Sequence, residues 1–260
     1  MPTTLPQSGV LVPLYIYPLT PNTWDPLYHA ITTNPHLPFL VIINPNSGPG
    51  ALPSPDANYA RELARLHTYP NVRTVGYIRI DYCRKPLSAT CDEIDRYATW
   101  AEQGLGVGGI MVDETPNHYH REKEEYLLKL RDYVKGKEGL GGEKLVVHNP
   151  GTPPDVPMAN AGPDLILVCE EPYARYQSQE VQHRLRELHY HRDRCGYMVT
   201  EVPDDVNMAD LVRDLRDRAT WIFVTEIVGD FYERFGPTSW GALMKALSVV
   251  DEGTEEKDGE

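Results

Sequence analysis

Cysteine is scarce in this chain of 260 residues, which carries only four: Cys83, Cys91, Cys169 and Cys195. No two of them stand in a CxxC pair, which excludes the spacing of a zinc knuckle and the dense framework of a disulfide-stapled domain. We therefore expect thiols that are free or buried in the core.

Basic residues are also in short supply, with 25 Lys and Arg against 38 Asp and Glu and a formal net charge of -13. Nucleic acids and anionic membranes need a basic surface to offset their phosphates, so neither is expected as a partner. A neutral or cationic ligand fits this charge balance better. The oligomeric state does not follow from it.

Long apolar runs are absent as well, and no stretch approaches the length of a membrane span. The segment Met1–Val10 lacks the basic and apolar regions of a signal peptide. The sequence as written therefore suggests a cytoplasmic protein, or a secreted one if a leader was removed. Its 41% hydrophobic and 24% charged residues are those of an ordinary globular protein.

What the chain does contain is a regular alternation of short apolar runs and amphipathic segments. Eight runs are expected as strands, at residues 9–17, 39–43, 72–80, 108–112, 145–148, 165–169, 196–201 and 221–225. Helices are expected between or after them, the clearest at 56–67, 90–103, 122–133, 178–190, 208–218 and 239–249. This pattern predicts an α/β fold, a single (β/α)8 barrel of the TIM type over residues 1–250, followed by a disordered acidic tail at 251–260.

In such a barrel the polar residues that follow the strands gather at one end and form the site. Lysine is missing from these positions, which excludes a Schiff-base aldolase. The turn-rich NPNSGPG segment at 44–50 lacks the Gly-Lys-Ser/Thr of a P-loop. The strand ends are instead acidic, aromatic and amide-bearing. They carry Tyr15, Tyr17, Asn44, Asn46, Tyr77, Asp81, Asp113, Glu114, His148, Asn149, Glu170, Glu201 and Glu226.

Each of these residues also has a structural interpretation. An acidic pair such as Asp113-Glu114 is often a solvated loop entry, and a strand-end histidine such as His148 can simply bond the backbone. The two HYH segments, at 118–120 and 189–191, space their histidines two residues apart, which on a helix places them on different faces. We therefore expect neither a metal site nor a cofactor.

Two carboxylates flanked by aromatic and amide side chains are what glycoside hydrolysis requires. One acid protonates the leaving oxygen, and the other carboxylate attacks the sugar or activates a water. Flat rings stack on sugars, and amides bond their hydroxyls. The strand ends therefore indicate a site for carbohydrate chemistry.

Several blocks of the sequence resemble the spherulin 4 family of fungal and slime-mould proteins: VPLYIYP, INPNSGPG, PDANY, VGYIRIDYCR, IDRYATW, GIMVDETP and TEIVGDFY. The resemblance runs from about Val10 to Trp240 and implies a (β/α)8 barrel. Characterised members of the family are endo-acting α-1,4-N-acetylgalactosaminidases that cut galactosaminogalactan. The resemblance thus also implies an oligo- or polysaccharide substrate.

Position by position, the resemblance places the family's strand-four acids on Asp113 and Glu114 and its strand-six glutamate on Glu170. Glu171 and a proline follow that glutamate where small residues are expected, which leaves open whether Glu170 or Glu171 faces the cleft. Glu226 stands where the family usually has an aspartate. The missing signal peptide is a third departure, because the polymer cut by secreted relatives lies outside the cell.

Two hypotheses follow. In the first, the protein is an endo-acting glycoside hydrolase with Asp113 as nucleophile and Glu170 as general acid/base, while the other strand-end residues position the sugar. Burial and the charge of Asp113 should then raise the pKa of Glu170. The two carboxyl groups should lie about 5–5.5 Å apart for retention of configuration, or roughly 6.5–9.5 Å apart for inversion. In the second, the barrel is a non-catalytic intracellular carbohydrate-binding or developmental protein.

Overall fold

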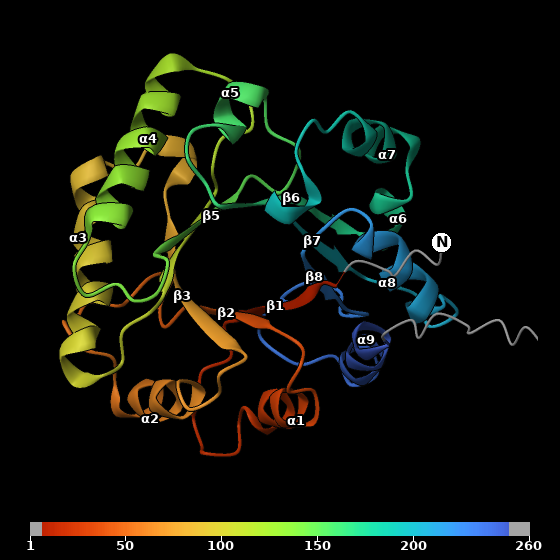
Figure 1. Ribbon diagram of the computed structural model, residues 1–260, viewed down its shortest axis with the longest axis horizontal. Coiled ribbons are helices and arrows are strands. Elements are labelled where there is room, and N and C mark those ends of the chain that lie inside the picture. Colours follow the sequence, from red (N-terminus) through yellow and green to blue (C-terminus); the bar gives the residue numbers. More distant parts are fainter. Residues whose placement is uncertain (1–6, 250–260) are drawn as a thin grey trace, which may run out of the picture.

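The computed structural model describes residues 7–249, which form a closed barrel of parallel strands (Figure 1). The strands follow one another in chain order, and the first pairs with the last. They are β1 (Gly9–Leu14), β2 (Phe39–Ile43), β3 (Val72–Arg79), β4 (Gly109–Asp113), β5 (Leu145–Asn149), β6 (Leu165–Pro172), β7 (Cys195–Thr200) and β8 (Trp221–Val224). The predicted (β/α)8 barrel is confirmed, whereas the expected acidic tail at 251–260 lies outside the described residues.

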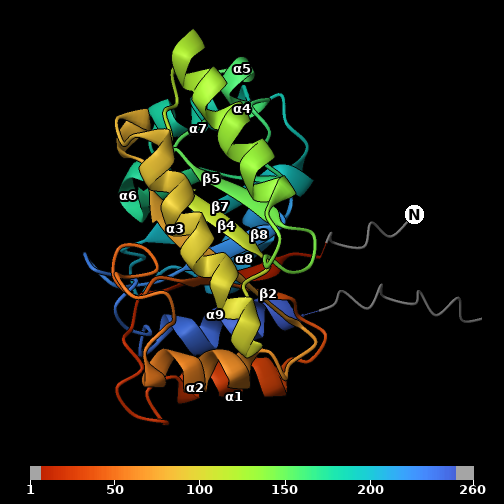
Figure 2. The same ribbon diagram turned by 90° about the vertical axis from the view of Figure 1, so that its left-hand side faces the viewer.

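Helices cover the outside of the barrel, and the two views show α3 and α4 side by side (Figures 1 and 2). The helices are α1 (Asp25–Thr33), α2 (Ala57–Leu66), α3 (Leu87–Thr99), α4 (Arg121–Gly136), α5 (Val156–Ala159), α6 (Tyr173–Tyr176), α7 (Gln179–Arg186), α8 (Met208–Arg216) and α9 (Ser239–Ser248). All the clearest expected helices are present with shifted ends, but the one-turn helices α5 and α6 were not expected. Among residues 7–249 no helix is long and apolar enough to cross a membrane.

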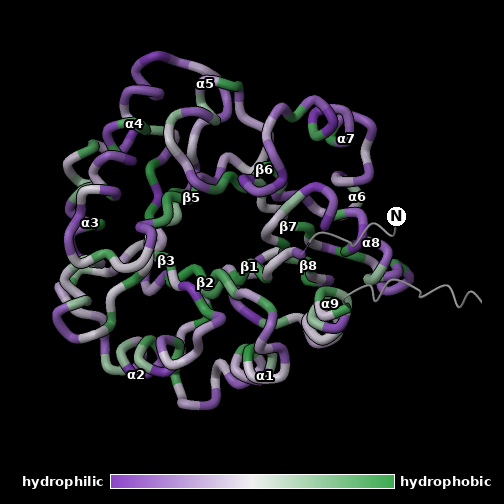
Figure 3. Tube along the Cα trace, in the orientation of Figure 1, coloured by the Kyte–Doolittle hydropathy of each residue, from purple (hydrophilic) through white to green (hydrophobic). Residues whose placement is uncertain are grey.

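Side chains along each strand alternate between two apolar clusters, because successive residues of a strand point to opposite faces. On β1, Leu11 lies inside the barrel, while Val10 and Val12 pack outward against the helices. Every strand contributes to the inner cluster: Leu11, Leu40, Ile42, Val75, Tyr77, Met111, Val147, Leu165, Leu167, Met198 and Phe223. The strands are accordingly among the most hydrophobic parts of the chain (Figure 3). Because the interior is filled, the chemistry has to lie at the strand ends.

Four strands, β1, β3, β7 and β8, end earlier than expected, and after β1 and β7 the backbone bonds the loop that follows β8. β1 stops before Tyr15, whose N–H donates to the carbonyl of Tyr232 at 3.0 Å in the loop between β8 and α9. β7 stops before Glu201, which has a left-handed backbone with φ of 54°. The first of these turns brings the β8–α9 loop against the end of β1.

Candidate active site

The acid that faces the barrel interior from β6 depends on an irregularity in that strand. Strict alternation from Leu167, which faces inward, would also bring Glu171 inward. The pairing of β6 with β7 shifts between Leu167 and Cys169, however, and Cys169 packs outward together with the residue before it. This β-bulge reverses the faces of the following residues. Glu170, and not Glu171, therefore stands opposite the inward-facing Met198.

Asp113, Asn149 and Glu170 form a connected group at the ends of β4, β5 and β6. The amide Nδ2 of Asn149 donates to Asp113 Oδ1 at 2.9 Å and to Glu170 Oε2 at 2.7 Å. Its own oxygen accepts the N–H of Gly151 at 3.0 Å, which turns the NH2 group toward the carboxylates. Because the two hydrogens of an amide diverge by about 120°, the two bonded carboxylate oxygens lie on the order of 5 Å apart.

Asp113 accepts two further hydrogen bonds. The hydroxyl of Tyr77 donates to its Oδ2 at 2.6 Å, and the N–H of Glu114 donates to its Oδ1 at 2.8 Å. Three donors therefore hold the two oxygens of this carboxylate in position. Glu114 itself lies beside Asp113, with its carboxylate 3.5 Å from Nε of Arg79.

Glu170 has the opposite environment. Burial raises the pKa of its carboxyl group, and the charges of Asp113 and Glu171 raise it further, against the hydrogen bond from Asn149. This direction agrees with the expectation from the sequence. One carboxylate surrounded by donors and one buried acid are the two states that glycosidic cleavage needs.

An aromatic wall flanks the pair on the side of β1. The ring of Tyr15 packs against Tyr77, with centroids 5.2 Å apart, and against Tyr232 at 4.8 Å. Burial raises the pKa of the Tyr15 hydroxyl well above its usual value, and the charges of Asp113 and Glu170 add to this effect. Tyr232 was not predicted as a site residue, because it does not directly follow a strand. The one feature of the sequence that pointed to it was its place in the TEIVGDFY block.

Comparison with known proteins identifies the family of this chain. The family model Spherulin4, Spherulation-specific family 4, matches residues 9–247. The chain belongs to the spherulin 4 family. The crystal structure of Aspergillus clavatus Sph3 in complex with GalNAc is similar, with a TM-score of 0.89 and 38% sequence identity over 94% of this chain and 98% of that one.

One further solved structure shares the barrel fold of this spherulin 4 chain. A chitinase from Bacteroides thetaiotaomicron matches with a TM-score of 0.50 and 9% identity over 97% of this chain and 100% of that one. At that identity the likeness concerns the fold and not the chemistry. A search of the curated proteins found no match.

Three other predicted residues lie on the rim next to β1 and β2 of this spherulin 4 barrel. The hydroxyl of Tyr17 bonds Oδ2 of Asp56 at 3.2 Å, at the start of α2. Asn44 accepts the N–H of Gly48 at 2.9 Å and so closes the NPNSGPG turn. Asn46 is exposed in that turn. Within residues 7–249 Tyr17 and Asn44 have these local contacts and no hydrogen bond to Asp113 or Glu170.

Asp81 and Glu201 follow the ends of β3 and β7 in left-handed conformations, with φ of 50° and 54°. Asp81 pairs with Arg84 on the surface, and Glu201 is exposed. Neither makes a hydrogen bond to the carboxylate pair within residues 7–249. Both lie on the rim of the spherulin 4 site.

Glu226, predicted to contact the sugar, is used to hold α9. Its Oε1 accepts the N–H of Thr238 at 2.8 Å, and its Oε2 accepts the hydroxyl of Ser239. Burial alone would raise the pKa of Glu226, but these hydrogen bonds lower it to about 2. Carboxylates are favoured at a helix N-terminus, where unpaired N–H groups gather. The carboxylate of Glu226 thus has a structural contact at the N-terminus of α9.

His148 lies on the outer face of β5, because its neighbours Val147 and Asn149 both face inward. It is only 3% exposed. Burial lowers the pKa of its imidazole to about 3, so the ring is neutral in the folded protein. The structure thus does not bring His148 to the predicted sugar site.

Replacing His148 by Gln should weaken the loss of stability in acid. The folded-state pKa of about 3 lies below the usual 6.5, so the unfolded chain takes up the proton first. Stability is therefore lost as pH falls from about 6.5 toward 3. The free energy of unfolding, measured in urea between neutral pH and about pH 4, should fall less steeply in His148→Gln.

The control for this variant is His29→Gln, at an exposed position of α1, which should keep the wild-type slope. An unchanged slope in His148→Gln would contradict the burial of a neutral imidazole.

Metal-binding residues are not gathered in the part of the chain that the structure describes. Across residues 7–249 no group of three or more His, Cys, Asp or Glu side chains could hold a metal ion. His118, from the first HYH segment, lies 3.8 Å from Asp155 as a surface pair. The four cysteines are free, and Cys169 and Cys195 are buried.

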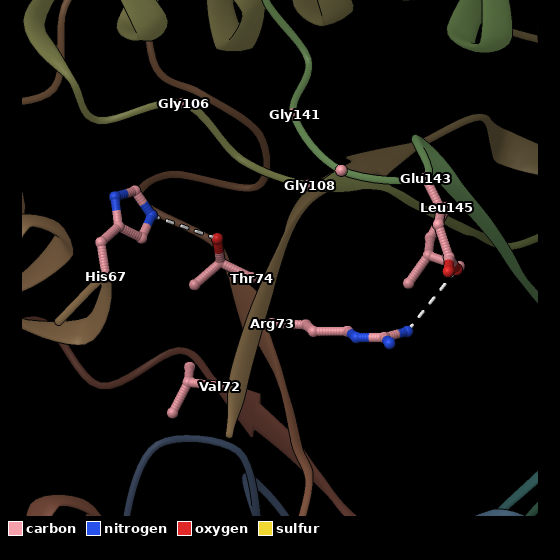
Figure 4. A pocket seen from close by; sticks show the side chains of 10 residues that line it. His67, Val72, Arg73, Thr74, Gly106, Gly108, Gly141, Glu143 and Leu145 are labelled. Carbon is pink, nitrogen blue, oxygen red and sulfur yellow. Dashed lines mark hydrogen bonds and ion pairs between the residues drawn. The ribbon is translucent and has the colours of Figure 1, made fainter. Parts of the chain in front are cut away.

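A hollow of about 420 Å³ lies at the opposite end of the barrel (Figure 4). It is lined by residues at the amino ends of β3 and β5, among them Arg73, Thr74 and Leu145. Arg73 pairs with Glu143 at 3.6 Å, and Thr74 contacts His67 at 3.4 Å. In barrels of this type the catalytic groups lie at the carboxyl ends of the strands, so we assign this hollow no part in the chemistry.

Proposed function

We propose that this spherulin 4 protein is a glycoside hydrolase that cuts within chains of α-1,4-linked galactosamine or N-acetylgalactosamine. The observation that carries the proposal is the sharing of one amide by Asp113 and Glu170, which sets a donor-rich carboxylate beside a buried acid. The likeness to Sph3, solved in complex with GalNAc, supports a hexosamine. The net charge of -13 suits chains that carry free amines.

In the proposed reaction the two carboxyl groups have separate roles. Asp113 attacks the anomeric carbon, and the bond to the leaving oxygen breaks as Glu170 gives that oxygen its proton. A water then attacks the sugar–Asp113 ester while Glu170 takes up its proton, which frees the sugar and restores both acids. Tyr77 and Asn149 hold Asp113 in position.

The spacing of the two acids supports retention of configuration. Their bonded oxygens share one NH2 group and lie on the order of 5 Å apart, near the about 5–5.5 Å of retaining enzymes. An inverting enzyme needs roughly 6.5–9.5 Å to hold a water between the acid and the base.

The configuration of the first product tests this proposal. During digestion of galactosaminogalactan and of its deacetylated form, NMR spectra should show α reducing ends first and β ends only after mutarotation. If β ends come first, Asp113 activates a water instead of attacking. Binding of these polymers without release of oligosaccharides would contradict the enzyme and favour a non-catalytic carbohydrate-binding protein.

A further inference from the structure

Three successive residues after β3 adopt a left-handed backbone. Asp81, Tyr82 and Cys83, which form the short turn η1 (Asp81–Cys83), have φ angles of 50°, 54° and 67°. This conformation is strained for residues other than glycine. Such strain persists only where the surroundings impose it, and it gathers at functional sites.

The strained turn is anchored on the strand that carries the proposed nucleophile. The N–H of Tyr82 donates to the carbonyl of Glu114 at 2.8 Å, and the N–H of Ile80 donates to the carbonyl of Asp113 at 3.2 Å. Glu114 is itself left-handed, with φ of 54°. The two turns therefore brace each other, and Tyr82 lies beside the end of β4.

What this turn holds in place is an exposed aromatic ring. Tyr82 is 46% exposed, so about half of its surface is left open to a ligand. The guanidinium of Arg84 lies 5.7 Å from the ring centroid and also pairs with Asp81, which restrains the ring from one side. A rigid exposed ring beside the proposed centre fits the apolar face of a pyranose.

Other exposed apolar side chains gather at the same end of the barrel. Within residues 7–249 the exposed large apolar side chains, apart from Val249, lie in segments that follow the carboxyl ends of strands. They are Tyr17, Leu19, Leu52, Tyr82, Tyr119, Val156 and Val228. An apolar rim around the mouth suits a polymer that extends beyond the sugar whose bond is cut.

We propose that Tyr82 is a stacking platform for a pyranose of the bound chain, outside the sugar whose bond is cut. This inference rests on the proposed function and adds a subsite to it. A glycine would fit the same backbone without strain, so a tyrosine at this position costs stability.

The variant Tyr82→Gly removes both the ring and the backbone strain, and their effects appear in different quantities: loss of the ring in KM, and relief of strain in Tm. Its Tm should hold or rise, because glycine accepts the left-handed backbone. Its KM for long α-1,4-linked galactosamine oligosaccharides should increase about three- to tenfold with kcat unchanged, whereas short chains that fill only the central subsites should behave as with wild type. Tyr82→Trp, which keeps a ring, should stay within about twofold of the wild-type KM.

Lys144→Gly is the matched control. Lys144 also has a left-handed backbone, with φ of 50°, but it precedes β5 at the opposite end of the barrel. Relief of strain there should change Tm in the same sense and leave KM unchanged for both chain lengths.

The possible results separate the platform from the proposed function. An unchanged KM of Tyr82→Gly for long chains would overturn the platform while the hydrolase stands. If the wild-type protein binds these chains without cleaving them, the hydrolase fails, and Kd should show the same three- to tenfold rise. If it neither cleaves nor binds them, both proposals fail.

Discussion

Replacing Asp113 by Asn is expected to lower kcat on galactosaminogalactan by about 10,000-fold or more, since the chemical step loses its nucleophile. The side chain keeps its size, and its remaining oxygen can still accept the N–H of Glu114. Oligosaccharide binding should therefore stay within about threefold of wild type, because ground-state contacts are preserved. Rates of reducing-end release and calorimetric binding measure the two effects separately.

Retained binding is the internal control for Asp113→Asn, because a misfolded variant would lose binding and turnover together. If Asp113→Asn kept most of the hydrolysis, the nucleophile would have to be Glu114 or the enzyme hypothesis would fail.

Replacing Glu170 by Gln should lower kcat on the polymer by about 100- to 10,000-fold, because the leaving oxygen no longer receives a proton. The loss should be far smaller for substrates with activated leaving groups, which need little protonation. The control is Glu171→Gln on the same strand, where the carboxylate lies 3.7 Å from Arg175. That variant should keep nearly all its activity. A large loss in Glu171→Gln alone would mean that Glu171 faces the cleft.

The pH dependence of activity and of stability is a second test of the role of Glu170. Only the protonated acid can donate, so wild-type activity should fall as pH rises through the raised pKa of Glu170. The same raised pKa contributes stability that is complete below the usual value of 4.5 and is lost as pH rises through the folded-state pKa. Glu170→Gln cannot ionise, so its Tm at neutral pH should exceed that of wild type.

The barrel could be predicted because each strand is a short apolar run and each helix has an apolar stripe. The same regularity placed Asp113 and Asn149 together, since neighbouring parallel strands end at one edge. The bulge in β6 could not be predicted in this way. Val168 and Cys169 are both apolar and would fit either face of the strand, so the sequence does not reveal which of the acids after them turns inward.

Two other features depend on contacts between distant segments. Tyr232 lies at the site because its carbonyl accepts the N–H of Tyr15, just after the end of β1. The sequence around either residue does not indicate this hydrogen bond. Glu226 was expected in the site because it follows a strand, but the N-terminus of α9, twelve residues later, takes its carboxylate. In both cases tertiary contacts decide the role of a residue whose type alone suits sugar binding.

The amide of Asn149 also affects when Glu170 holds its proton during the proposed reaction. While Asp113 is a free carboxylate, its charge helps keep the proton on Glu170. In the proposed reaction that charge disappears once Asp113 is esterified, and the amide that both acids shared can turn its bonding toward Glu170 alone. Both changes make Glu170 release a proton more readily. Glu170 would then remain a carboxylate after the first step, which is the form that takes a proton from the attacking water, so one side chain serves first as acid and then as base.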